Sequence, residues 1–365
     1  MSEVSNSVPV QSGEELVISR MSLTDHEQVV FCYDKPTGLK AIIAIHNTVL
    51  GPALGGTRMW NYKSEADALK DVLRLSRGMT YKAAISGLNL GGGKAVIIGD
   101  SRKDKSEALF RRFGKFVDSL AGKYITAEDV GISPKDMSYV NMETDSVSGL
   151  PGEGGDPSPI TAYGVYVGMK AAAKRKFGSD SLEGKKIAVQ GVGHVGEYLV
   201  EFLASEGAVI TVTDIHQETL RRVASEYNAK VVEPDAIYDV DMDIYAPCAL
   251  GATVNDDTLS RLKCSIIAGA ANNQLAKEDV HGKAVMDQGM LYVPDFMINA
   301  GGLMNCYVEL TGYKKDLAMA RAEDIYGTTL SILDRSAREN IPTYQIANIM
   351  SEERIEAIGK VKLSY

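Results

Sequence analysis

Residues 185–196 read Lys-Lys-Ile-Ala-Val-Gln-Gly-Val-Gly-His-Val-Gly, and this stretch decides the fold class. The apolar run predicts a strand over 185–190, and glycines with the spacing G-x-G-x-x-G then open a predicted helix. A second predicted strand over 208–213 leads to Asp214, 18 residues beyond the last glycine. A strand, a glycine turn, a helix and a second strand in this order predict a parallel α/β domain.

The glycine spacing in this context is the fingerprint of a Rossmann dinucleotide-binding turn. Gly191 allows the tight turn, Gly193 lets a pyrophosphate approach the backbone, and Gly196 lets the helix pack on the strand. Asp214 is expected to accept hydrogen bonds from ribose hydroxyls. Because its charge would repel a 2′-phosphate, the sequence favours NAD over NADP. A glycine-rich turn that binds nothing is the alternative.

Small-residue loops follow three later predicted strands, over 243–245, 265–268 and 291–293, and such loops line the carboxyl edge of a parallel sheet. We expect His194 to be a bystander within the turn. The residues predicted at the cofactor are Gly191, Val192, Gly193, His194, Val195, Gly196, Asp214, Thr161, Ala249, Asn273 and Asn299.

A second stretch, residues 78–95, carries Lys82, Lys94 and three successive glycines at 91–93. Glycine costs about 1 kcal/mol against alanine in an ordered element, so the run predicts a sharp turn or a close backbone approach. It is not a triphosphate-binding loop, because the required glycine is replaced by Leu88. We expect a helix to end near residue 77 and present this segment as a loop; a solvated surface turn is the alternative.

The composition excludes several classes of function. A net charge of −9 argues against nucleic acid as a partner. The four cysteines are far apart and form no C-x-x-C, so we predict neither a metal site nor a disulfide framework. The amino terminus has no apolar signal region, and no run of apolar residues is long enough to cross a membrane. The sequence therefore predicts a cytoplasmic protein.

The chain predicts two α/β domains with a cleft between them. Predicted elements of the first include a hairpin over 27–45, a helix over 106–120, and a strand that ends at Glu128 and Asp129. A Gly- and Pro-rich stretch around 150–159 predicts the boundary. The expected division is a substrate-binding and oligomerisation domain over 1–150, a Rossmann NAD-binding domain over 151–335, and a carboxy-terminal helix over 336–365.

Residues 26–309 resemble the glutamate/leucine/phenylalanine/valine dehydrogenase superfamily, and its leucine dehydrogenases most closely. Five blocks carry the resemblance. They are Gly-Pro-Ala-Leu-Gly-Gly-Thr-Arg-Met (51–59), Arg-Gly-Met-Thr-Tyr-Lys (77–82), Gly-Gly-Gly-Lys (91–94), Ala-Glu-Asp-Val-Gly (127–131) and Asn-Ala-Gly-Gly (299–302).

The resemblance implies an NAD-dependent oxidative deamination of an L-amino acid to a 2-oxo acid and ammonia. It makes Lys82 the partner of the substrate carboxylate, Lys94 the catalytic lysine, and Asp129 the acid that handles protons at the amino group. It also implies a homo-oligomer, from dimer to octamer, and a carboxy-terminal helix that returns to the first domain.

The chemistry requires a base that is neutral near the working pH, because water must attack an iminium carbon after hydride has left. Lowering a lysine pKa from about 10.4 to about 8 costs roughly 3 kcal/mol. A second ammonium about 6 Å away supplies about 2 to 3 kcal/mol of this at an effective dielectric constant near 20. We therefore expect Lys82 to activate Lys94, with desolvation supplying the remainder.

The resemblance places Leu303 and Cys306 on one wall of the substrate pocket and Leu54 and Gly55 on the other. Leucine dehydrogenases usually carry valine at the positions of Leu303 and Cys306. The lining has no lysine or serine partner for a side-chain carboxylate, so glutamate is not the expected substrate. Branched-chain amino acids are favoured, and a phenylalanine- or tryptophan-type enzyme is the alternative. A non-catalytic NAD-binding protein and a Schiff-base lyase that uses Lys94 are alternatives of other classes.

Overall fold

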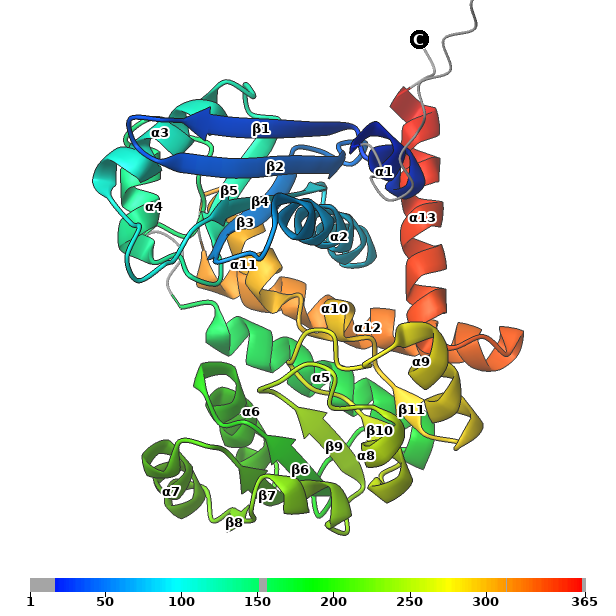
Figure 1. Ribbon diagram of the computed structural model, residues 1–365. Coiled ribbons are helices and arrows are strands. Elements are labelled where there is room, and N and C mark those ends of the chain that lie inside the picture. The colour runs from blue at the N-terminus through cyan, green and yellow to red at the C-terminus, as the bar shows by residue number, and fades with distance from the viewer. Residues whose placement is uncertain (1–16, 151–155, 313, 363–365) are drawn as a thin grey trace, which may run out of the picture.

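The computed structural model describes residues 17–150, 156–312 and 314–362, which form two β-sheets flanked by helices (Figure 1). The first half contains α1 (Val17–Thr24), β1 (Gln28–Asp34), β2 (Leu39–Asn47), β3 (Ala53–Trp60), α2 (Glu65–Ile85), β4 (Gly91–Ile98), α3 (Glu107–Asp118), β5 (Tyr124–Glu128) and α4 (Pro134–Asn141). The second half begins with α5 (Ser158–Phe177), β6 (Lys186–Gln190), α6 (His194–Ser205), β7 (Val209–Thr213), α7 (Gln217–Glu226), β8 (Lys230–Val231), a 3-10 helix η1 (Asp235–Asp239), β9 (Ile244–Pro247) and α8 (Asp256–Arg261). It continues with β10 (Ile266–Ile267), α9 (Glu278–Asp287), β11 (Leu291–Tyr292), α10 (Asp295–Ile298), α11 (Gly301–Glu309), α12 (Lys315–Glu339) and α13 (Thr343–Lys362).

The first sheet has the strand order β1-β2-β4-β3-β5 and is mixed. β1 and β2 form the predicted antiparallel hairpin, β4 runs antiparallel to β2, and β3 runs parallel to both β4 and β5. Its two faces are covered by different helices. Ile42 and Ala44 of β2 pack with Leu69 of α2, while Ile43 packs with Phe113 of α3 on the other face. Helices on both faces confirm the predicted α/β class.

Helix α2 is longer than the sequence predicted. Ser64 caps its first turn by accepting a hydrogen bond from the backbone N–H of Asp67, but the helix runs to Ile85 and does not end near residue 77. Gly78 lowers the helix propensity by about 1 kcal/mol. Burial of the following turn outweighs this cost, because Tyr81 and Ala84 are both buried. Lys82 therefore projects from a rigid helix.

The glycine run at 91–93 is also not a loop, because it begins strand β4. The expected close backbone approach is present. A Cβ added to Gly92 would lie 2.1 Å from the backbone N of Thr80 in α2. Glycine is therefore required where a helix packs directly onto a strand, and Lys94 follows within the same strand.

The second sheet is wholly parallel, with the order β11-β10-β9-β6-β7-β8. β6 lies in the middle, and the chain turns outward in one direction to β7 and in the other to β9. This is the doubly wound order that the glycine motif predicts, with the topological switch beside β6. The two-residue strand β8 was not predicted, because it is short and exposed.

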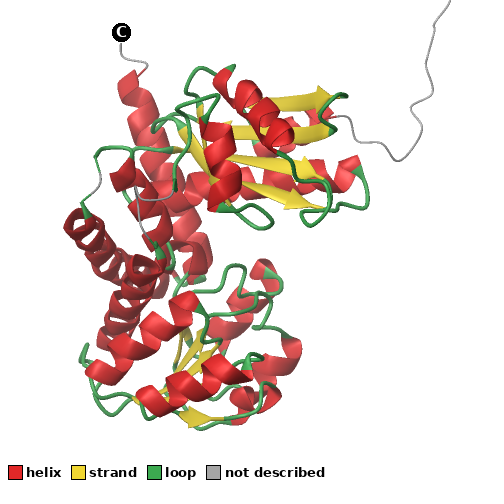
Figure 2. Ribbon diagram, turned by 90° about the vertical axis from the view of Figure 1, so that its left-hand side faces the viewer, coloured by secondary structure: helices red, strands yellow, loops and turns green. Residues whose placement is uncertain are grey.

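Helices join the two sheets along one side of the molecule (Figure 2). α5 packs against α12, and α13 packs against α2 of the first half. The contact between α13 and α2 includes hydrogen bonds from Ser351 Oγ to the Tyr81 carbonyl (3.3 Å) and from Arg354 Nη1 to the Ala84 carbonyl (3.3 Å). Residues 151–155 of the predicted linker lie outside the described residues. None of the described helices combines the length and apolarity that a bilayer span requires.

Candidate functional site

Lys94 and Asp129 meet at the centre of the candidate site. Lys94 lies in β4 and Asp129 directly follows β5, and β3 pairs with both of these strands. The Nζ of Lys94 is 2.9 Å from Oδ2 of Asp129, and Lys94 is only 7% exposed. The structure thus brings two sequence-predicted residues into direct contact. The adjacent Glu128 is exposed, so the two successive carboxylates have different environments.

Arg58 is a member of this cluster that the sequence did not single out. Its Nε lies 3.1 Å from Oδ2 of Asp129, and its Nη1 lies 3.1 Å from Oδ2 of Asp71 in α2. Tyr62 completes the network by donating to the same oxygen of Asp71 at 2.8 Å. The only signal in the sequence was the position of Arg58 at the end of the glycine-rich stretch that became β3. Arg58 and Lys94 therefore hold the same oxygen of Asp129.

Burial controls the charges in the cluster. It lowers the pKa of Lys94 below its ordinary value; the charge of Arg58 lowers it further, and Asp129 opposes both. Burial acts to raise the pKa of Asp129, but Lys94 and Arg58 outweigh it and hold this pKa below its ordinary value. Asp129 is therefore the anion of the pair. Lys94 is a lysine whose proton is released more easily than usual.

Lys82 links this cluster to the second sheet. Its Nζ donates to Oδ1 of Asn299 at 2.7 Å. The amide nitrogen of Asn299 donates to the Ala270 carbonyl (3.0 Å) and to Oδ1 of Asn272 (2.7 Å), in the loop after β10. Lys82 therefore lies beside the carboxyl edge of the second sheet, where a bound cofactor is expected.

Burial is also the largest cause of the altered basicity of Lys82. It lowers the pKa of Lys82 to about 8; Asp295 opposes the change, Lys94 adds to it, and Asp129 opposes it. The sequence-based account expected the ammonium of Lys82 to supply most of the pKa shift of Lys94, and desolvation the remainder. At Lys94 the largest cause is burial, and the cation that adds to it is Arg58, which corrects that account.

The four predicted pocket residues lie on two elements. Leu54 and Gly55 belong to β3, and Leu303 and Cys306 belong to α11. Leu54 and Leu303 are 3% and 7% exposed and share one hydrophobic cluster, against which Cys306 packs. Burial raises the pKa of the Cys306 thiol to about 11, so the group behaves as a small neutral side chain. Leu54 of the first half and Leu303 of the second thus belong to one continuous apolar cluster.

The glycine turn has the geometry that a dinucleotide requires. Gly191 has a φ of +99°, and a Cβ added there would lie 2.4 Å from that of Ala249, so only glycine fits. Gly193 is exposed, and a Cβ added to it would meet no atom within 4 Å. Helix α6 begins there without a side-chain cap, which leaves its first N–H groups open to an anion. These residues fit a dinucleotide pyrophosphate.

Asp214 is fixed at the end of β7. Its two carboxylate oxygens accept hydrogen bonds from the backbone N–H groups of Val192 and His216, each at 2.8 Å. His194 is exposed, as expected for a bystander. The carboxylate therefore holds the glycine turn and also presents a negative charge beside it.

The other predicted cofactor residues are dispersed around the same edge. Ala249 lies against Gly191, and Asn273 accepts a long hydrogen bond of 3.5 Å from Arg74 of α2. Thr161 lies in the first turn of α5 and donates to the Pro157 carbonyl at 3.0 Å. The Asn299 amide oxygen is bound to Lys82, a contact that the sequence did not predict.

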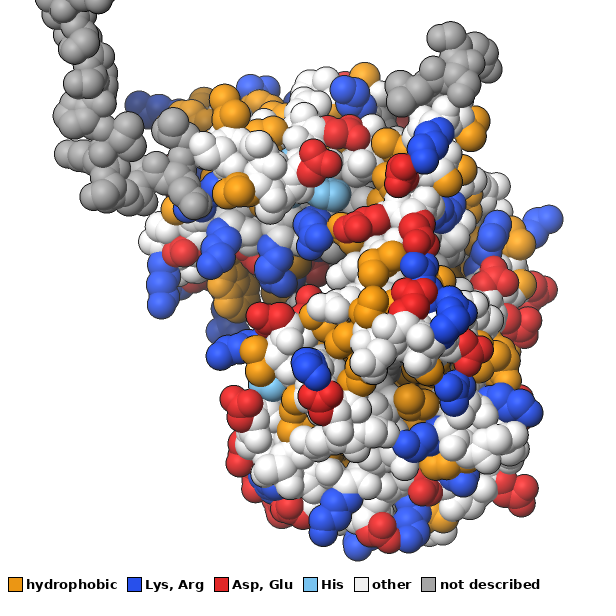
Figure 3. All heavy atoms as spheres, turned by 90° about the vertical axis from the view of Figure 1, so that its right-hand side faces the viewer, with side chains coloured by type: hydrophobic (Ala, Val, Ile, Leu, Met, Phe, Trp, Pro, Cys, Tyr) orange, Lys and Arg blue, Asp and Glu red, His pale blue; other side chains and the backbone are white. Residues whose placement is uncertain are grey.

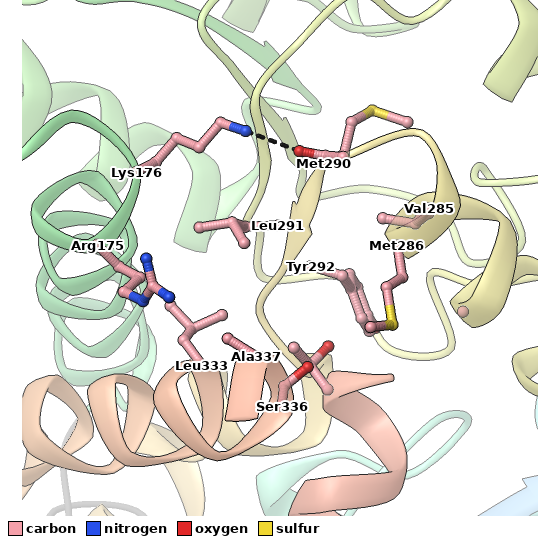
Figure 4. Close-up of a pocket in the computed structure, with 13 residues that line it drawn as sticks. Arg175, Lys176, Val285, Met286, Met290, Leu291, Tyr292, Leu333, Ser336 and Ala337 are labelled. Carbon is pink, nitrogen blue, oxygen red and sulfur yellow. Dashed lines mark hydrogen bonds between the residues drawn. The ribbon is translucent and has the colours of Figure 1, made fainter. Parts of the chain in front are cut away.

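A separate cavity of about 240 Å³ lies away from this site, between α5, α9, β11 and α12 (Figure 4). The two cationic side chains at it are already bound: Lys176 donates to the Gly289 carbonyl, and Arg175 pairs with Asp334. Within the described part of the chain, no group of three or more His, Cys, Asp or Glu side chains is arranged to hold a metal ion.

The space-filling view shows the molecule notched between its upper and lower halves, with Lys and Arg side chains along the upper margin of the notch (Figure 3). A Rossmann-type glycine turn on one sheet and a buried Lys94–Asp129 pair on the other, joined through Lys82 and Asn299, define an α/β oxidoreductase.

Comparison with known proteins identifies the family. Residues 26–146 match the model of the Glu/Leu/Phe/Val dehydrogenase dimerisation domain, and residues 155–217 and 215–357 match that of Glutamate/Leucine/Phenylalanine/Valine dehydrogenase. Leucine dehydrogenase of Bacillus cereus is 57% identical over 344 residues, which cover 93% of this chain and 94% of the relative. That of Thermoactinomyces intermedius is 55% identical over 352 residues, covering 96% of each. This chain belongs to the Glu/Leu/Phe/Val dehydrogenase family.

The crystal structure of L-tryptophan dehydrogenase from Nostoc punctiforme resembles the fold closely, with a TM-score of 0.86 and 45% identity over 94% of this chain and 99% of that one. Family membership makes the protein an amino acid dehydrogenase that uses a nicotinamide cofactor.

Proposed function

We propose that this chain catalyses the NAD-dependent oxidative deamination of branched-chain L-amino acids (leucine, valine and isoleucine) to the 2-oxo acid and ammonia. The observation that carries the proposal is the buried contact of Lys94 with Asp129 beside Lys82. Identity of 55–57% to leucine dehydrogenases over most of the chain supports the choice of substrate class.

Each side chain has a role that follows from its charge. The ammonium of Lys82 pairs with the substrate carboxylate, and the buried wall formed by Leu54, Gly55, Leu303 and Cys306 receives the aliphatic side chain. A bound nicotinamide would supply the acceptor for the hydride that leaves Cα. Neutral Lys94 then takes a proton from the water that attacks the iminium carbon. Asp129, held by Arg58, shuttles a proton to the departing ammonia.

We assign NAD rather than NADP to the glycine turn. The carboxylate of Asp214 is fixed by Val192 and His216 at the point where an adenosine ribose would lie. A fixed negative charge accepts hydrogen bonds from ribose hydroxyls and repels a 2′-phosphate. Turnover with NADP is therefore expected to be much slower than with NAD.

The test is a panel of leucine, isoleucine, valine, phenylalanine, tryptophan and glutamate, each with NAD and with NADP, followed by the appearance of reduced nicotinamide. Branched-chain amino acids with NAD are expected to give the highest kcat/KM. A preference for phenylalanine or tryptophan would establish the aromatic alternative, which the small Cys306 side chain favours. No turnover with any of them would support a non-catalytic NAD-binding protein.

A Schiff-base lyase would behave differently. It would be trapped on Lys94 by borohydride in the presence of a carbonyl substrate, and it would need no nicotinamide. Trapping without NAD-dependent turnover would replace the present proposal by that one.

We also propose a homo-oligomer and a cytoplasmic location. Phe31 and Tyr33 are 55% and 64% exposed on the edge strand β1, which a second copy of this chain could cover. The described cysteines are all free, as suits a reducing compartment. Light scattering coupled to gel filtration tests the first proposal, since a monomer would contradict it.

The proposed domains are residues 1–150 for substrate and assembly, 151–335 for the cofactor, and 336–365 as the helix that returns to the first domain. The hydrogen bonds of Ser351 and Arg354 to α2 support the last assignment.

A further inference from the structure

Asp295 is a buried carboxylate that the reaction scheme above leaves without a role. It is the first residue of α10, which is separated from β11 by Val293 and Pro294, and it is 6% exposed. Its Oδ2 accepts a hydrogen bond from the backbone N–H of Gln274 (2.8 Å), and its own N–H donates to the hydroxyl of Tyr292 (3.2 Å). A buried charge is costly, so this one requires an explanation.

The loop that holds Asp295 is itself fixed. Gln274 has no exposed surface, and its amide nitrogen donates to the Gly269 and Ala271 carbonyls at 2.8 and 2.9 Å. The carboxylate therefore has a defined position at the carboxyl edge of the second sheet.

Helix α10 directs this position toward Lys82. The helix packs against α2, and Asn299, the residue after its last turn, accepts the hydrogen bond from Nζ of Lys82 at 2.7 Å. One short helix thus gives Lys82 an uncharged contact at one end and a negative charge at the other.

The charged groups around Lys82 come from three elements. Asp295 of α10 stabilises its ammonium most, Asp129 beyond β5 does so less, and Lys94 of β4 destabilises it. Around Asp295 itself, burial raises the pKa, while the backbone N–H of Gln274 and the charge of Lys82 lower it. The net direction at Asp295 is upward, and the charge of Lys82 acts against it.

We propose that Asp295 is a positioning residue for the reaction: its carboxylate, supplied by the second domain, keeps Lys82 protonated so that Lys82 can bind the substrate carboxylate. The inference rests on the proposed function, because that function assigns the substrate carboxylate to Lys82. It makes a different carboxylate the main anionic neighbour of each lysine. Asp129 serves the lysine that must release a proton, and Asp295 serves the lysine that must retain one.

The test is Asp295→Asn, which keeps the size of the side chain and an acceptor for Gln274 but removes the charge. Lys82 should then lose its proton at a lower pH, so the ratio of the variant KM for leucine to that of the wild type should rise with pH. At pH values above the pKa of Lys82 in both proteins, this ratio levels off. Its limit is about tenfold for each unit by which the substitution lowers the pKa of Lys82. kcat and its acid limb, which Lys94 determines, should stay near those of the wild type.

Three further variants separate charge from structure. Asp295→Glu retains the charge and should return the pH dependence toward that of the wild type. Asp295→Ser removes the charge with a smaller side chain and should reproduce the effect of Asp295→Asn. Glu278→Gln removes a carboxylate on α9 that interacts with Asp295, Arg74 and Arg77, and it should leave the KM profile unchanged.

Titration of Lys82 provides a readout that needs no turnover. Competitive acetylation of the whole protein, followed by mass spectrometry across a pH series, should give a lower pKa for Lys82 in Asp295→Asn than in the wild type. The same pKa in both proteins, or a KM that rises equally at every pH, would overturn the inference. If the wild type oxidised no amino acid, the proposed function would fail, and the acetylation result would still decide the link between Asp295 and Lys82.

Discussion

In β4, the central strand of the first sheet, Lys94 is 7% exposed and pairs with a carboxylate, whereas in the turn after β6 of the second sheet Gly193 is exposed and has no side chain at all. The first region acts through buried charges, and the second through open backbone N–H groups. Both regions are rich in glycine, yet for different reasons. In β4 glycine lets α2 and neighbouring strands pack closely, and in the turn it leaves space for a ligand.

The two regions therefore have different tasks: the first transfers protons, and the second binds the cofactor. A proton can be moved near neutral pH only if a lysine is perturbed, and perturbation requires burial. A pyrophosphate needs unobstructed donors, and burial by protein would remove them. Substitutions in the first region should therefore affect kcat and pH dependence, and substitutions in the second should affect KM for the cofactor.

The largest effect is expected for Lys94→Ala. Removal of a general base lowers kcat by about 10²- to 10⁴-fold. The matched control is Lys105→Ala, which removes the lysine of another pair, with Asp136, outside the cluster. Steady-state kinetics with leucine and NAD measure both variants. Equal kcat values for the wild type and Lys94→Ala would show that the first region does not carry the chemical step.

Gly193→Val tests the second region. The new side chain meets no protein atom within 4 Å of its Cβ, so the melting temperature should stay close to that of the wild type. It would obstruct hydrogen bonds from α6 to an anion, each worth about 1.5 to 3 kcal/mol, so KM for NAD should rise about 10- to 100-fold. An unchanged KM for NAD would show that the cofactor does not use this turn.

His46→Gln tests whether the interior beside the first region excludes water. His46 in β2 is bonded through Nδ1 to the hydroxyl of Thr80 at 2.8 Å, and burial, then the charges of His26 and Arg77, lowers its pKa to about 4. The folded-state pKa lies below the unfolded value of about 6.5. Below that value the unfolded chain takes up a proton that the folded protein refuses, so stability falls as the pH drops from about 6.5 to about 4.

The expected loss at His46 is about 2 kcal/mol between about pH 7 and about pH 5. Urea unfolding at both pH values measures it in the wild type and in His46→Gln. The variant should lose less stability on acidification, whatever its stability at neutral pH. An identical loss in both proteins would contradict the burial of this histidine.

The smallest effect is expected for Cys306→Val in the pocket wall. One added methyl group changes selectivity by about 1 to 3 kcal/mol at most, and a position at the edge of a pocket contributes less. The ratio of kcat/KM for leucine to that for phenylalanine should therefore rise by less than about tenfold. Cys32→Val, at a buried thiol in the core of the first sheet, is the control and should leave the ratio unchanged.

The same contrast explains what the sequence could predict. The second sheet follows local rules, since a short apolar strand, a glycine turn and an amphipathic helix are each visible within a few residues. Five of its strands and its parallel α/β class were predicted for that reason, and the short exposed strand β8 was not. In the first region, the predicted end of α2 was wrong. Gly78 is a local signal that favours a helix end, whereas the burial of Tyr81 and Ala84, which extends the helix, depends on tertiary packing.

The candidate site shows the same limit. Lys82, Lys94 and Asp129 were chosen from their motifs, and the contact between the last two was found. The contacts of Arg58 with Asp129 and of Lys82 with Asn299 join residues 71 and 217 positions apart, which no local pattern reveals. Asp295 was missed because a lone aspartate after a short strand has no signature until its burial is known.

The most direct test of the central claim is the rescue of Lys94→Ala by primary amines of graded basicity, with leucine and NAD as substrates. If Lys94 acts as the base, kcat should rise with the concentration of the free amine and with its basicity, and the acid limb of the pH profile should follow the pKa of the added amine. If added amines left the kcat of Lys94→Ala unchanged and its pH profile matched that of the wild type, another group would be the one that takes the proton.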